Sequence, residues 1–230
     1  MPQSRYFVDS TFEKEKRVFL SYEETRHLRV LRKQEGERVE LVNGQNQLAQ
    51  GQIISFGKKE ACVEILEFEE SLPATVPVIL CQAIPRMPRL DLIVEKGTEL
   101  GMHELWLFVG EKSEKKSPSL PRLRAISISA MKQCGRLDLP KILLKPPLSS
   151  WKEEELPYTG FYGDLSPNAP SLLNAKKNDP GTLLFIGPEG GFSSTEKKIL
   201  ESLHIQGVKL HPHVLRTDTA PIVGLSILNA

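Results

Sequence analysis

The chain has 230 residues, of which 40% are hydrophobic and 26% are charged, and its formal net charge is +1. This composition is typical of one folded domain or of two smaller ones, and it excludes disorder as the main state of the chain. No apolar run approaches the roughly 20 residues that span a bilayer, and residues 1–8 lack the basic and apolar regions of a secretion signal. We therefore expect a cytosolic protein that has no membrane segment.

Neither the cysteines nor the histidines predict a metal site. Cys62, Cys81 and Cys134 are odd in number and widely spaced, which argues against a disulfide framework and a Cys-x-x-Cys metal knuckle. His211 and His213 alternate along a predicted strand and would face the same side, but no third ligand has a suitable spacing. We expect structural thiols and no bound metal.

Residues 1–72 predict a small β-rich domain. Val39 and Leu41 alternate with charged residues, and Asn43-Gly44 then supplies the positive φ angles of a tight turn. Two further apolar strands are predicted at 52–56 and 61–68. Three strands and one short helix favour a compact barrel, which suits the presentation of cations to a partner better than it suits an enzyme site.

The helix of this domain lies between its first strands and begins at Ser21. Ser21 and Glu24 have the spacing of a capping box, in which each side chain binds a free backbone amide of the other residue. Leu28 and Leu31 form the predicted buried face. The opposite face carries cationic and ionisable side chains, namely Arg26, His27, Arg29 and Arg32.

Two prolines mark the predicted domain boundary at Leu72-Pro73-Ala74-Thr75-Val76-Pro77, because neither a helix interior nor a central strand accepts them. From residue 73 to residue 230, short apolar runs alternate with segments of helical period, and Gly101 and Gly135 are typical helix stops. This pattern predicts an α/β domain with a buried, mainly parallel sheet. Its predicted strands are 78–83, 105–109, 142–144, 160–163, 183–186 and 208–210.

Positive charge is concentrated in one part of this second domain. Residues 111–145 contain nine Lys or Arg against three Asp or Glu, whereas residues 1–70 contain eleven against thirteen. A local basic patch is expected of a protein that binds a polyanion, because each cation that neutralises a phosphate releases counterions. Most charge runs are only solvated faces, so the pattern alone leaves both interpretations open.

A glycine-rich turn follows the predicted strand 183–186. Gly187-Pro188-Glu189-Gly190-Gly191 lets a ligand approach the backbone, and a second capping box, from Ser193 to Glu196, begins the next helix. Ligands of open α/β sheets bind at this end of the strands, and we expect the size of Gly187 and Gly190 to matter there. The spacing excludes the dinucleotide and P-loop motifs. The alternative is a strand-to-helix connection that binds nothing.

A second strand, loop and helix start lie at residues 210–221. Arg216 is in the loop, and Asp218 follows it beside a predicted C-terminal helix that Thr217 or Thr219 would cap. A guanidinium cannot accept a proton, but it can stabilise a developing oxyanion, and a carboxylate can take a proton. The alternative role for Asp218 is to cap the helix.

Several segments match known motifs in order over nearly the whole chain. Gly187-Pro188-Glu189-Gly190-Gly191-Phe192-Ser193 and Val214-Leu215-Arg216-Thr217-Asp218-Thr219-Ala220 form a paired signature. The other segments are Arg5-Tyr6-Phe7, His27-Leu28-Arg29-Val30-Leu31-Arg32, Lys96-Gly97-Thr98-Glu99-Leu100-Gly101 and Gln133-Cys134-Gly135-Arg136. Together they resemble the bacterial 16S ribosomal RNA uridine-N3 methyltransferases, the RsmE family of the SPOUT class.

The resemblance implies an N-terminal PUA-like β-barrel over residues 1–72, followed by a SPOUT α/β domain over residues 73–230 with a C-terminal deep trefoil knot. It implies a homodimer that transfers a methyl group from S-adenosylmethionine to N3 of one uridine in 16S ribosomal RNA, either free or in the small ribosomal subunit. The competing hypotheses are a SPOUT enzyme that acts on another RNA, and an inactive RNA-binding assembly factor with the same fold.

The resemblance also implies roles for individual residues. Arg216 is the expected electrostatic catalyst at a uracil oxygen, and Asp218 is a candidate proton acceptor unless bulk hydroxide suffices. The expected cofactor residues are Gly163, Leu165, Ile186, Gly187, Pro188, Glu189, Gly190, Leu210, Leu215 and Arg216, with the adenine in an apolar slot at Ile186, Leu210 and Leu215. The expected RNA contacts are Arg5, His27, Arg29, Arg32, Lys112, Lys115, Lys116 and Arg136.

The chain departs from the family pattern at four positions. The family usually has glycine at the position of His211, arginine near His213, glutamate at the position of Asp218 and an acidic residue at the position of Lys132. These departures concern the substrate side more than the cofactor side.

Overall fold

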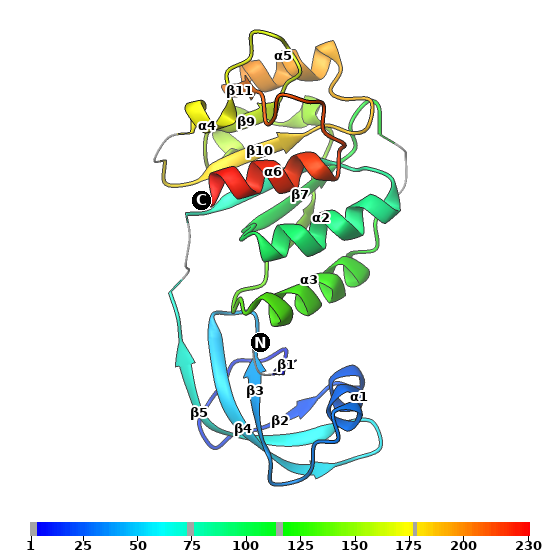
Figure 1. Ribbon diagram of the computed structural model, residues 1–230, viewed down its shortest axis with the longest axis vertical. Helices are drawn as coiled ribbons and strands as arrows, with labels where there is room; N and C mark the ends of the chain where they lie inside the picture. Colours follow the sequence, from blue (N-terminus) through cyan, green and yellow to red (C-terminus); the bar gives the residue numbers. More distant parts are fainter. Residues whose placement is uncertain (1–3, 73–75, 114–116, 177–178) are drawn as a thin grey trace. The chain divides into compact units, whose positions relative to one another are not determined.

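The computed structural model describes the chain except for residues 1–3, 73–75, 114–116 and 177–178 (Figure 1). The chain forms two compact units. The first unit consists of Met1–Ala74 with Ile128–Leu139, and the second of Thr75–Ser127 with Pro140–Ala230. The first unit therefore includes a segment that the sequence analysis placed in the second domain, while the predicted boundary at residue 72 stays a prediction.

The N-terminal unit is built on a five-stranded sheet with the order β1-β3-β4-β5-β2. Its strands are β1 (Arg5–Phe7), β2 (Arg17–Leu20), β3 (Arg38–Val42), β4 (Gln47–Phe56) and β5 (Ala61–Glu70). The sequence predicted only three of them, since β1 and β2 are short and lie between charged residues. Inward-facing side chains of these strands form one apolar core around Tyr6, Leu41, Ile53 and Ile65, which are at most 1% exposed.

Helix α1 (Tyr22–Val30) is shorter than the sequence predicted. Ser21 Oγ accepts a hydrogen bond from Glu24 N at 3.3 Å, so one half of the expected capping box is present. The other half is replaced, because the Glu24 carboxylate pairs with Lys132. The helix ends before Leu31, whose side chain is 43% exposed and does not join the buried face. Arg32 lies beyond the helix with a φ of 56°.

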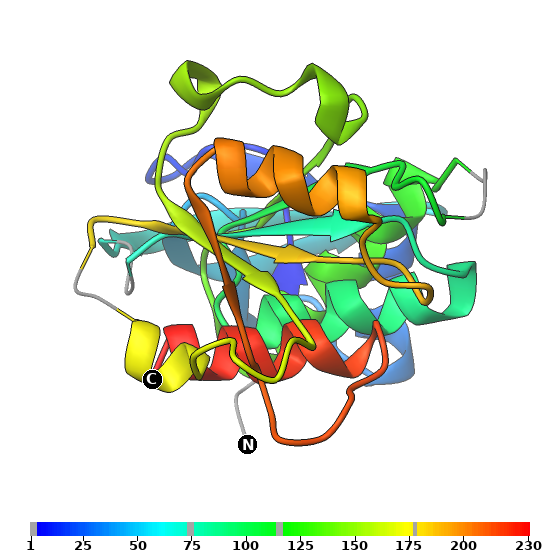
Figure 2. The same cartoon turned by 90° about the horizontal axis from the view of Figure 1, so that it is seen from above.

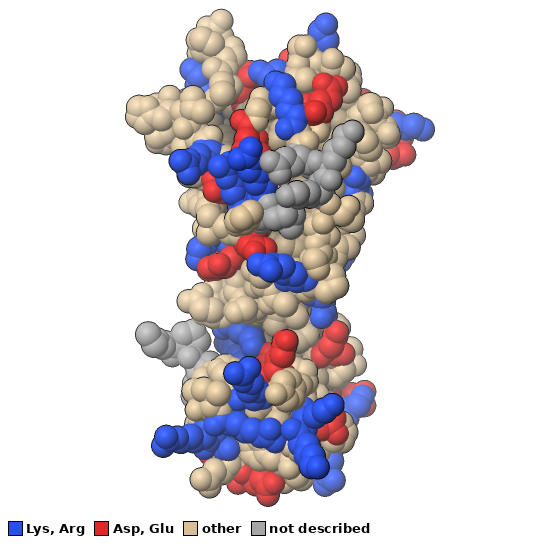
Figure 3. All heavy atoms as spheres, turned by 90° about the vertical axis from the view of Figure 1, so that its right-hand side faces the viewer, with Lys and Arg blue, Asp and Glu red and all other residues tan. Residues whose placement is uncertain are grey.

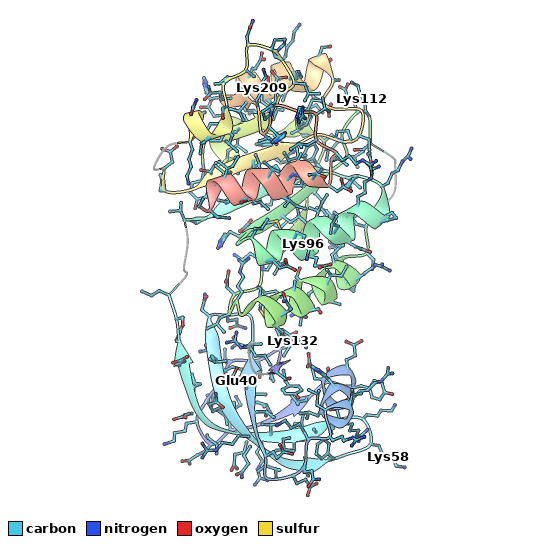
Figure 4. All side chains as sticks on the ribbon, in the orientation of Figure 1. Glu40, Lys58, Lys96, Lys112, Lys132 and Lys209 are labelled. Carbon is cyan, nitrogen blue, oxygen red and sulfur yellow. The ribbon has the colours of Figure 1, made fainter. Side chains whose placement is uncertain are left out.

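Lys132, which is labelled in Figure 4, is one of the four departures from the family pattern, and its ion pair with Glu24 ties it into the N-terminal unit. Lys132 Nζ lies 2.5 Å from Glu24 Oε1, and the two side chains are 18% and 9% exposed. Glu24 Oε2 is buried and has no hydrogen-bond partner among the described residues. Lys132 is therefore the cation that compensates this buried carboxylate.

Replacing Lys132 with methionine is expected to lower the free energy of unfolding by about 2 kcal/mol, because it leaves a buried carboxylate unpaired. Lys16→Met is the matched control, since the Lys16–Glu13 pair has side chains that are 44% and 66% exposed. Exposed pairs contribute less than about 1 kcal/mol. Urea unfolding followed by circular dichroism compares the two variants, and equal losses would contradict the structural role of Lys132.

The second unit contains a six-stranded sheet with the order β11-β9-β10-β6-β7-β8, and every recorded pair of neighbouring strands is parallel. The strands are β6 (Val78–Ala83), β7 (Glu104–Phe108), β8 (Lys141–Leu144), β9 (Gly160–Gly163), β10 (Thr182–Ile186) and β11 (Ile205–Val208). The mixed α/β class with a parallel sheet is confirmed. The last predicted strand, 208–210, is displaced, because the observed strand ends where the prediction begins.

Helices cover both faces of this sheet (Figure 2). One face carries α2 (Met87–Glu99), α4 (Leu172–Ala175) and α6 (Thr219–Leu228), with α6 in contact with β6 and β10. The other face carries α5 (Ser194–Ser202) and the short 3-10 turns Leu148–Ser150 and Glu153–Glu155. Helix α3 (Leu120–Cys134) is shared by the two units. Gly101 and Gly135 follow α2 and α3 with φ angles of 83° and 88°, as the predicted helix stops require.

Within the described part of the chain, no helix combines the length and the apolar character that crossing a membrane requires.

Candidate active site

Three loops meet at one edge of the parallel sheet. Strands β11, β9 and β10 are neighbours and run in the same direction, so the loops that leave their carboxyl ends lie together. A Cβ atom added to Gly163 would lie 3.6 Å from Leu210 Cδ1 and 3.7 Å from Ile186 Cδ1. The last residues of β9 and β10 therefore meet Leu210 of the loop after β11 at this point, which is the place where open α/β sheets bind ligands.

The turn after β10 is held by hydrogen bonds from two directions. The capping box of α5 is complete, because Glu196 N donates to Ser193 Oγ at 3.0 Å and Ser193 N donates to Glu196 Oε2 at 2.8 Å. Glu196 Oε1 also accepts from Glu111 N at 3.0 Å, although Glu196 is buried. The start of α5 is thereby tied to the segment that follows β7.

Lys112 binds the turn itself. Its Nζ donates to Gly190 O at 3.0 Å and lies 3.5 Å from Phe192 O (Figure 4). Lys112 is an expected RNA contact by family resemblance, whereas in the structure this cation has partners within the protein. Lys115 and Lys116, which were predicted beside it, lie outside the described residues.

The glycines of the turn differ in what they permit. Gly187 and Gly190 do not have positive φ angles, whereas Gly191 has a φ of 66°. A Cβ atom on Gly187 would lie 3.0 Å from Phe192 N, and one on Gly190 would lie 3.0 Å from Lys112 Cδ. A side chain at position 187 would meet backbone atoms, whereas one at position 190 would meet the side chain of Lys112.

The loop that carries Arg216 is fixed through its neighbour Thr217. The Thr217 hydroxyl donates to Gly187 O at 2.8 Å and accepts from Gln82 Nε2 at 3.2 Å, so it does not cap the helix as predicted. Arg216 is exposed, and its backbone oxygen accepts from Thr219 N at 3.0 Å and Ala220 N at 2.8 Å. Arg216 is thus exposed to solvent, while its backbone is held by the start of α6 and, through Thr217, by Gly187.

Asp218 has the position of an N-cap but does not perform that role. Its side chain makes no capping hydrogen bond to α6. Its Oδ2 lies 3.9 Å from Arg89 Nε, and its buried Oδ1 has no hydrogen-bond partner among the described residues. Capping, the alternative role for Asp218, is therefore not observed.

Glu189 joins the turn to the beginning of α2. Its Oε1 accepts from Arg86 N at 3.2 Å and from Arg89 Nη1 at 3.1 Å. Arg89 thus faces carboxylates from two loops, Glu189 and Asp218. Arg89 was not predicted as a site residue, since nothing in its local sequence indicates these distant partners.

The apolar residues expected to line an adenine slot lie together. Ile186, Leu210 and Leu215 belong to one core cluster with Ala220 of α6. Leu165 is different, because its side chain is 68% exposed. Pro188 is buried within the turn.

Other ionisable groups near the sheet are poor candidates for proton transfer. Burial raises the pKa of Tyr162, next to Gly163, to about 12, with Asp164 and Glu201 adding to the effect. Burial likewise raises the pKa of the Cys81 thiol well above its usual value, and Lys145 only partly opposes this. Both groups therefore stay protonated at neutral pH.

The rings of His211 and His213 lie close to each other in the loop after β11. The two rings lie 5.4 Å apart, and His211 Nδ1 accepts from His213 N at 3.1 Å. Among the described residues, no group of three His, Cys, Asp or Glu side chains is placed to hold a metal ion.

The predicted RNA contacts of the N-terminal unit fall into two groups. Arg5 donates to Glu40 Oε2 at 3.1 Å and to Gly135 O at 2.7 Å, and Arg136 pairs with Asp138 at 2.6 Å. His27, Arg29 and Arg32 are exposed, although Arg29 also donates to the backbone oxygens of Gly57 and Lys58. Figure 3 shows a band of Lys and Arg side chains across the face of this unit.

Two protein families match the chain. The RNA methyltransferase PUA domain matches residues 20–66, and the RNA methyltransferase domain matches residues 72–229. The chain is thus a member of the RNA methyltransferase class, and the match over residues 20–66 confirms the PUA-like prediction for the N-terminal domain.

Individual relatives show which RNA methyltransferases the chain is similar to. Ribosomal RNA small subunit methyltransferase E of Aquifex aeolicus is 30% identical over 89% of this chain and 90% of its own length. The Bacillus subtilis protein of the same name is 25% identical over 98% of this chain and 95% of its own length. A Legionella pneumophila protein solved with bound S-adenosylmethionine superposes with a TM-score of 0.90, at 27% identity, over 99% of this chain and 97% of its own. The chain belongs to the ribosomal RNA small subunit methyltransferase E family, as the motifs predicted.

Proposed function

We propose that this protein transfers a methyl group from S-adenosylmethionine to N3 of a uridine in 16S ribosomal RNA. The observation that carries the proposal is the meeting of three loops at the carboxyl edge of β11, β9 and β10, with Arg216 exposed in the loop after β11. The relatives named for small-subunit ribosomal RNA methylation, and the Legionella structure with its bound cofactor, support the substrate and the methyl donor. Action on ribosomal RNA would place the protein in the cytoplasm.

The residues where the three loops meet suit the adenine ring of the cofactor, which has apolar faces and a polar edge. Gly163 lies where the side chains of Ile186 and Leu210 approach, and a Cβ there would meet them at 3.6–3.7 Å. These side chains and Leu215 would hold the adenine, while backbone groups of the turn would bind its edge. When bound, S-adenosylmethionine supplies an electrophilic methyl group on a positively charged sulfur.

Arg216 and Asp218 would act on the uridine. N3 must lose its proton before or during attack on the methyl group, and the resulting charge spreads to the neighbouring carbonyl oxygens. Arg216 would donate hydrogen bonds to one of these oxygens as the charge develops. Asp218 is the candidate proton acceptor, because its side chain is only 16% exposed and is not used for capping.

The proposal includes the trefoil knot of the SPOUT class. Hydrogen bonds hold Lys209 against several residues of one preceding loop (Figure 4). Lys209 N donates to Pro170 O, Leu172 N donates to Lys209 O, and Lys209 Nζ donates to Pro167 O, each at 2.8 Å. These bonds place Lys209 beside the segment 167–172 that follows β9, which would form the loop of the knot.

The RNA is expected to contact the exposed cations of the N-terminal unit, among them His27, Arg29 and Arg32. Phosphate contacts of this kind give affinity without sequence information, so the target base must be selected elsewhere. The family resemblance supports a homodimer with the RNA across both subunits.

Replacing Gly190 with valine is expected to lower the affinity for S-adenosylmethionine at least about tenfold, because the side chain occupies ligand space at the turn. The nearest atoms to the new side chain, Lys112 Cδ at 3.0 Å and Lys112 Cβ at 3.3 Å, belong to one lysine side chain, which must move aside. Calorimetry measures the affinity. Lys112→Met is the control that separates lost ligand space from displacement of Lys112, and native affinity in Gly190→Val would remove the turn from the cofactor site.

The proposed function is tested in two steps on the purified protein. Calorimetry first measures binding of S-adenosylmethionine and S-adenosylhomocysteine. Mass spectrometry then identifies methylated nucleosides in 16S ribosomal RNA and in small subunits after incubation with the protein and the methyl donor. Absence of cofactor binding would leave an RNA-binding assembly factor, and methylation of a different RNA would leave the second SPOUT alternative. N3-methyluridine in 16S ribosomal RNA is the expected product.

A further inference from the structure

A buried amide stands at the end of β6, within an otherwise apolar strand. Gln82 is 0% exposed, and its Nε2 donates to Ala83 O at 2.9 Å and to Thr217 Oγ1 at 3.2 Å. The orientation of the amide follows from its surroundings, because a carbonyl oxygen such as that of Ala83 can only accept. The nitrogen of Gln82 must therefore face Thr217.

The direction of the Thr217 hydroxyl then follows. Thr217 is 6% exposed, and its oxygen lies 2.8 Å from Gly187 O. Since Gln82 donates to this oxygen and Gly187 O can only accept, the single hydroxyl hydrogen points to Gly187. The result is a directed chain from Gln82 through Thr217 to Gly187, which joins the ends of β6 and β10 to the loop after β11.

This chain links the two halves of the proposed site. Gly187 begins the turn expected to hold the cofactor, and Thr217 stands between Arg216 and Asp218. Arg216 is exposed, so its place relative to the turn depends on the backbone at Thr217. Buried hydrogen bonds of this kind fix geometry, because breaking one leaves an unpaired polar group without water.

We propose that Thr217 is a positioning residue whose hydroxyl, oriented by Gln82, holds the Arg216 and Asp218 segment at a fixed separation from the cofactor turn. The inference rests on the proposed function for its effect on methyl transfer. The tether itself is a property of the cofactor-free protein and is tested there as well.

The experiment compares three threonine variants. Thr217→Val removes the hydroxyl at nearly constant volume, and Thr217→Ser keeps it. Thr98→Val is the matched control, because Thr98 is 0% exposed in α2 and its hydroxyl donates to Val94 O at 2.7 Å, away from the loops. Each variant is measured for amide hydrogen exchange without cofactor, for the Kd of S-adenosylmethionine, and for the kcat and KM of methyl transfer to RNA.

In the cofactor-free protein, Thr217→Val is expected to speed exchange at Gly191, Thr219 and Ala220, whose amides close the turn and begin α6. Thr98→Val and Thr217→Ser should leave these rates near native. Unchanged exchange in Thr217→Val would overturn the tether, whether or not the native protein transfers methyl groups. Absence of transfer by the native protein would instead reject the proposed function.

In the active protein, Thr217→Val is expected to lower kcat by about 10- to 100-fold with cofactor Kd within about threefold, since small misplacement of reacting groups has effects of this size. Thr217→Ser should restore most of the rate. Gln82→Met should add little to the loss in Thr217→Val, because Gln82 acts through the same hydroxyl. A serine variant as slow as the valine variant, or fully additive losses, would overturn the positioning role.

Discussion

Replacing Arg216 with alanine is expected to slow methyl transfer at least about a hundredfold while leaving cofactor affinity near native, because removal of one transition-state donor has this effect in other enzymes. The change should not disturb the loop. The alanine variant keeps the backbone oxygen of residue 216, which accepts hydrogen bonds from the first amides of α6. It also keeps the hydrogen bond from the Thr217 hydroxyl to Gly187 O.

Testing the Arg216 variant requires both the rate of methyl transfer and the affinity for the cofactor. Single-turnover transfer gives the rate, and calorimetry with S-adenosylhomocysteine gives the affinity. Lys198→Ala is a suitable control, because Lys198 is an exposed cation on α5 of the same unit. Turnover near the native rate would reject a catalytic role for Arg216. If the affinity for S-adenosylhomocysteine instead fell as much as turnover, Arg216 would be a residue that contacts the cofactor.

Replacing Gly160 with alanine is expected to lower the free energy of unfolding by more than about 3 kcal/mol, beyond the usual range for overpacking. A Cβ at this position would lie 2.1 Å from Leu183 O and 2.7 Å from Leu183 Cβ. Leu183 lies opposite Gly160 on β10, whose other edge pairs with β6. Neither backbone can move aside without breaking the sheet that carries the loops.

Gly163 provides the control within the same strand. A Cβ at Gly163 would meet its nearest neighbours at 3.6–3.7 Å, which is ordinary van der Waals contact. Gly163→Ala should therefore leave stability near native, and the lower chain entropy of alanine favours it slightly. Both tryptophans, Trp106 and Trp151, pack against each other in this unit, so their fluorescence during urea unfolding reports the relevant transition. Equal stabilities of the two variants would contradict the close approach at Gly160.

The strands were predictable where apolar residues run without interruption. The runs that form β6 and β9 were predicted with their observed ends, because both strands are almost wholly buried. Strand β2 was missed, since it has only four residues and begins at the end of the charged run 13–17. Strand β11 was displaced because Gln206 and Gly207 interrupt its apolar pattern.

The candidate site was predictable only where the sequence is locally unusual. The turn from Gly187 and the loop around Arg216 were found from glycines and capping residues. Their connection through Gln82 and Thr217 depends on strand order, which places residues 82, 187 and 217 side by side although they are distant in sequence. A glutamine inside an apolar strand is the one local signal that could have pointed to this connection.

The N-terminal unit also has a consequence for biosynthesis. Phe7 and Val42 are covered by Met131, with Leu137 and Leu139 packed against the same cluster. During translation the residues up to 74 are made first, and about 65 more must follow before residue 139 exists, which takes roughly 3–13 s at bacterial and eukaryotic elongation rates. For that time the nascent barrel lacks its apolar cover. The part of the protein that is synthesised first is therefore completed only after α3 has been made.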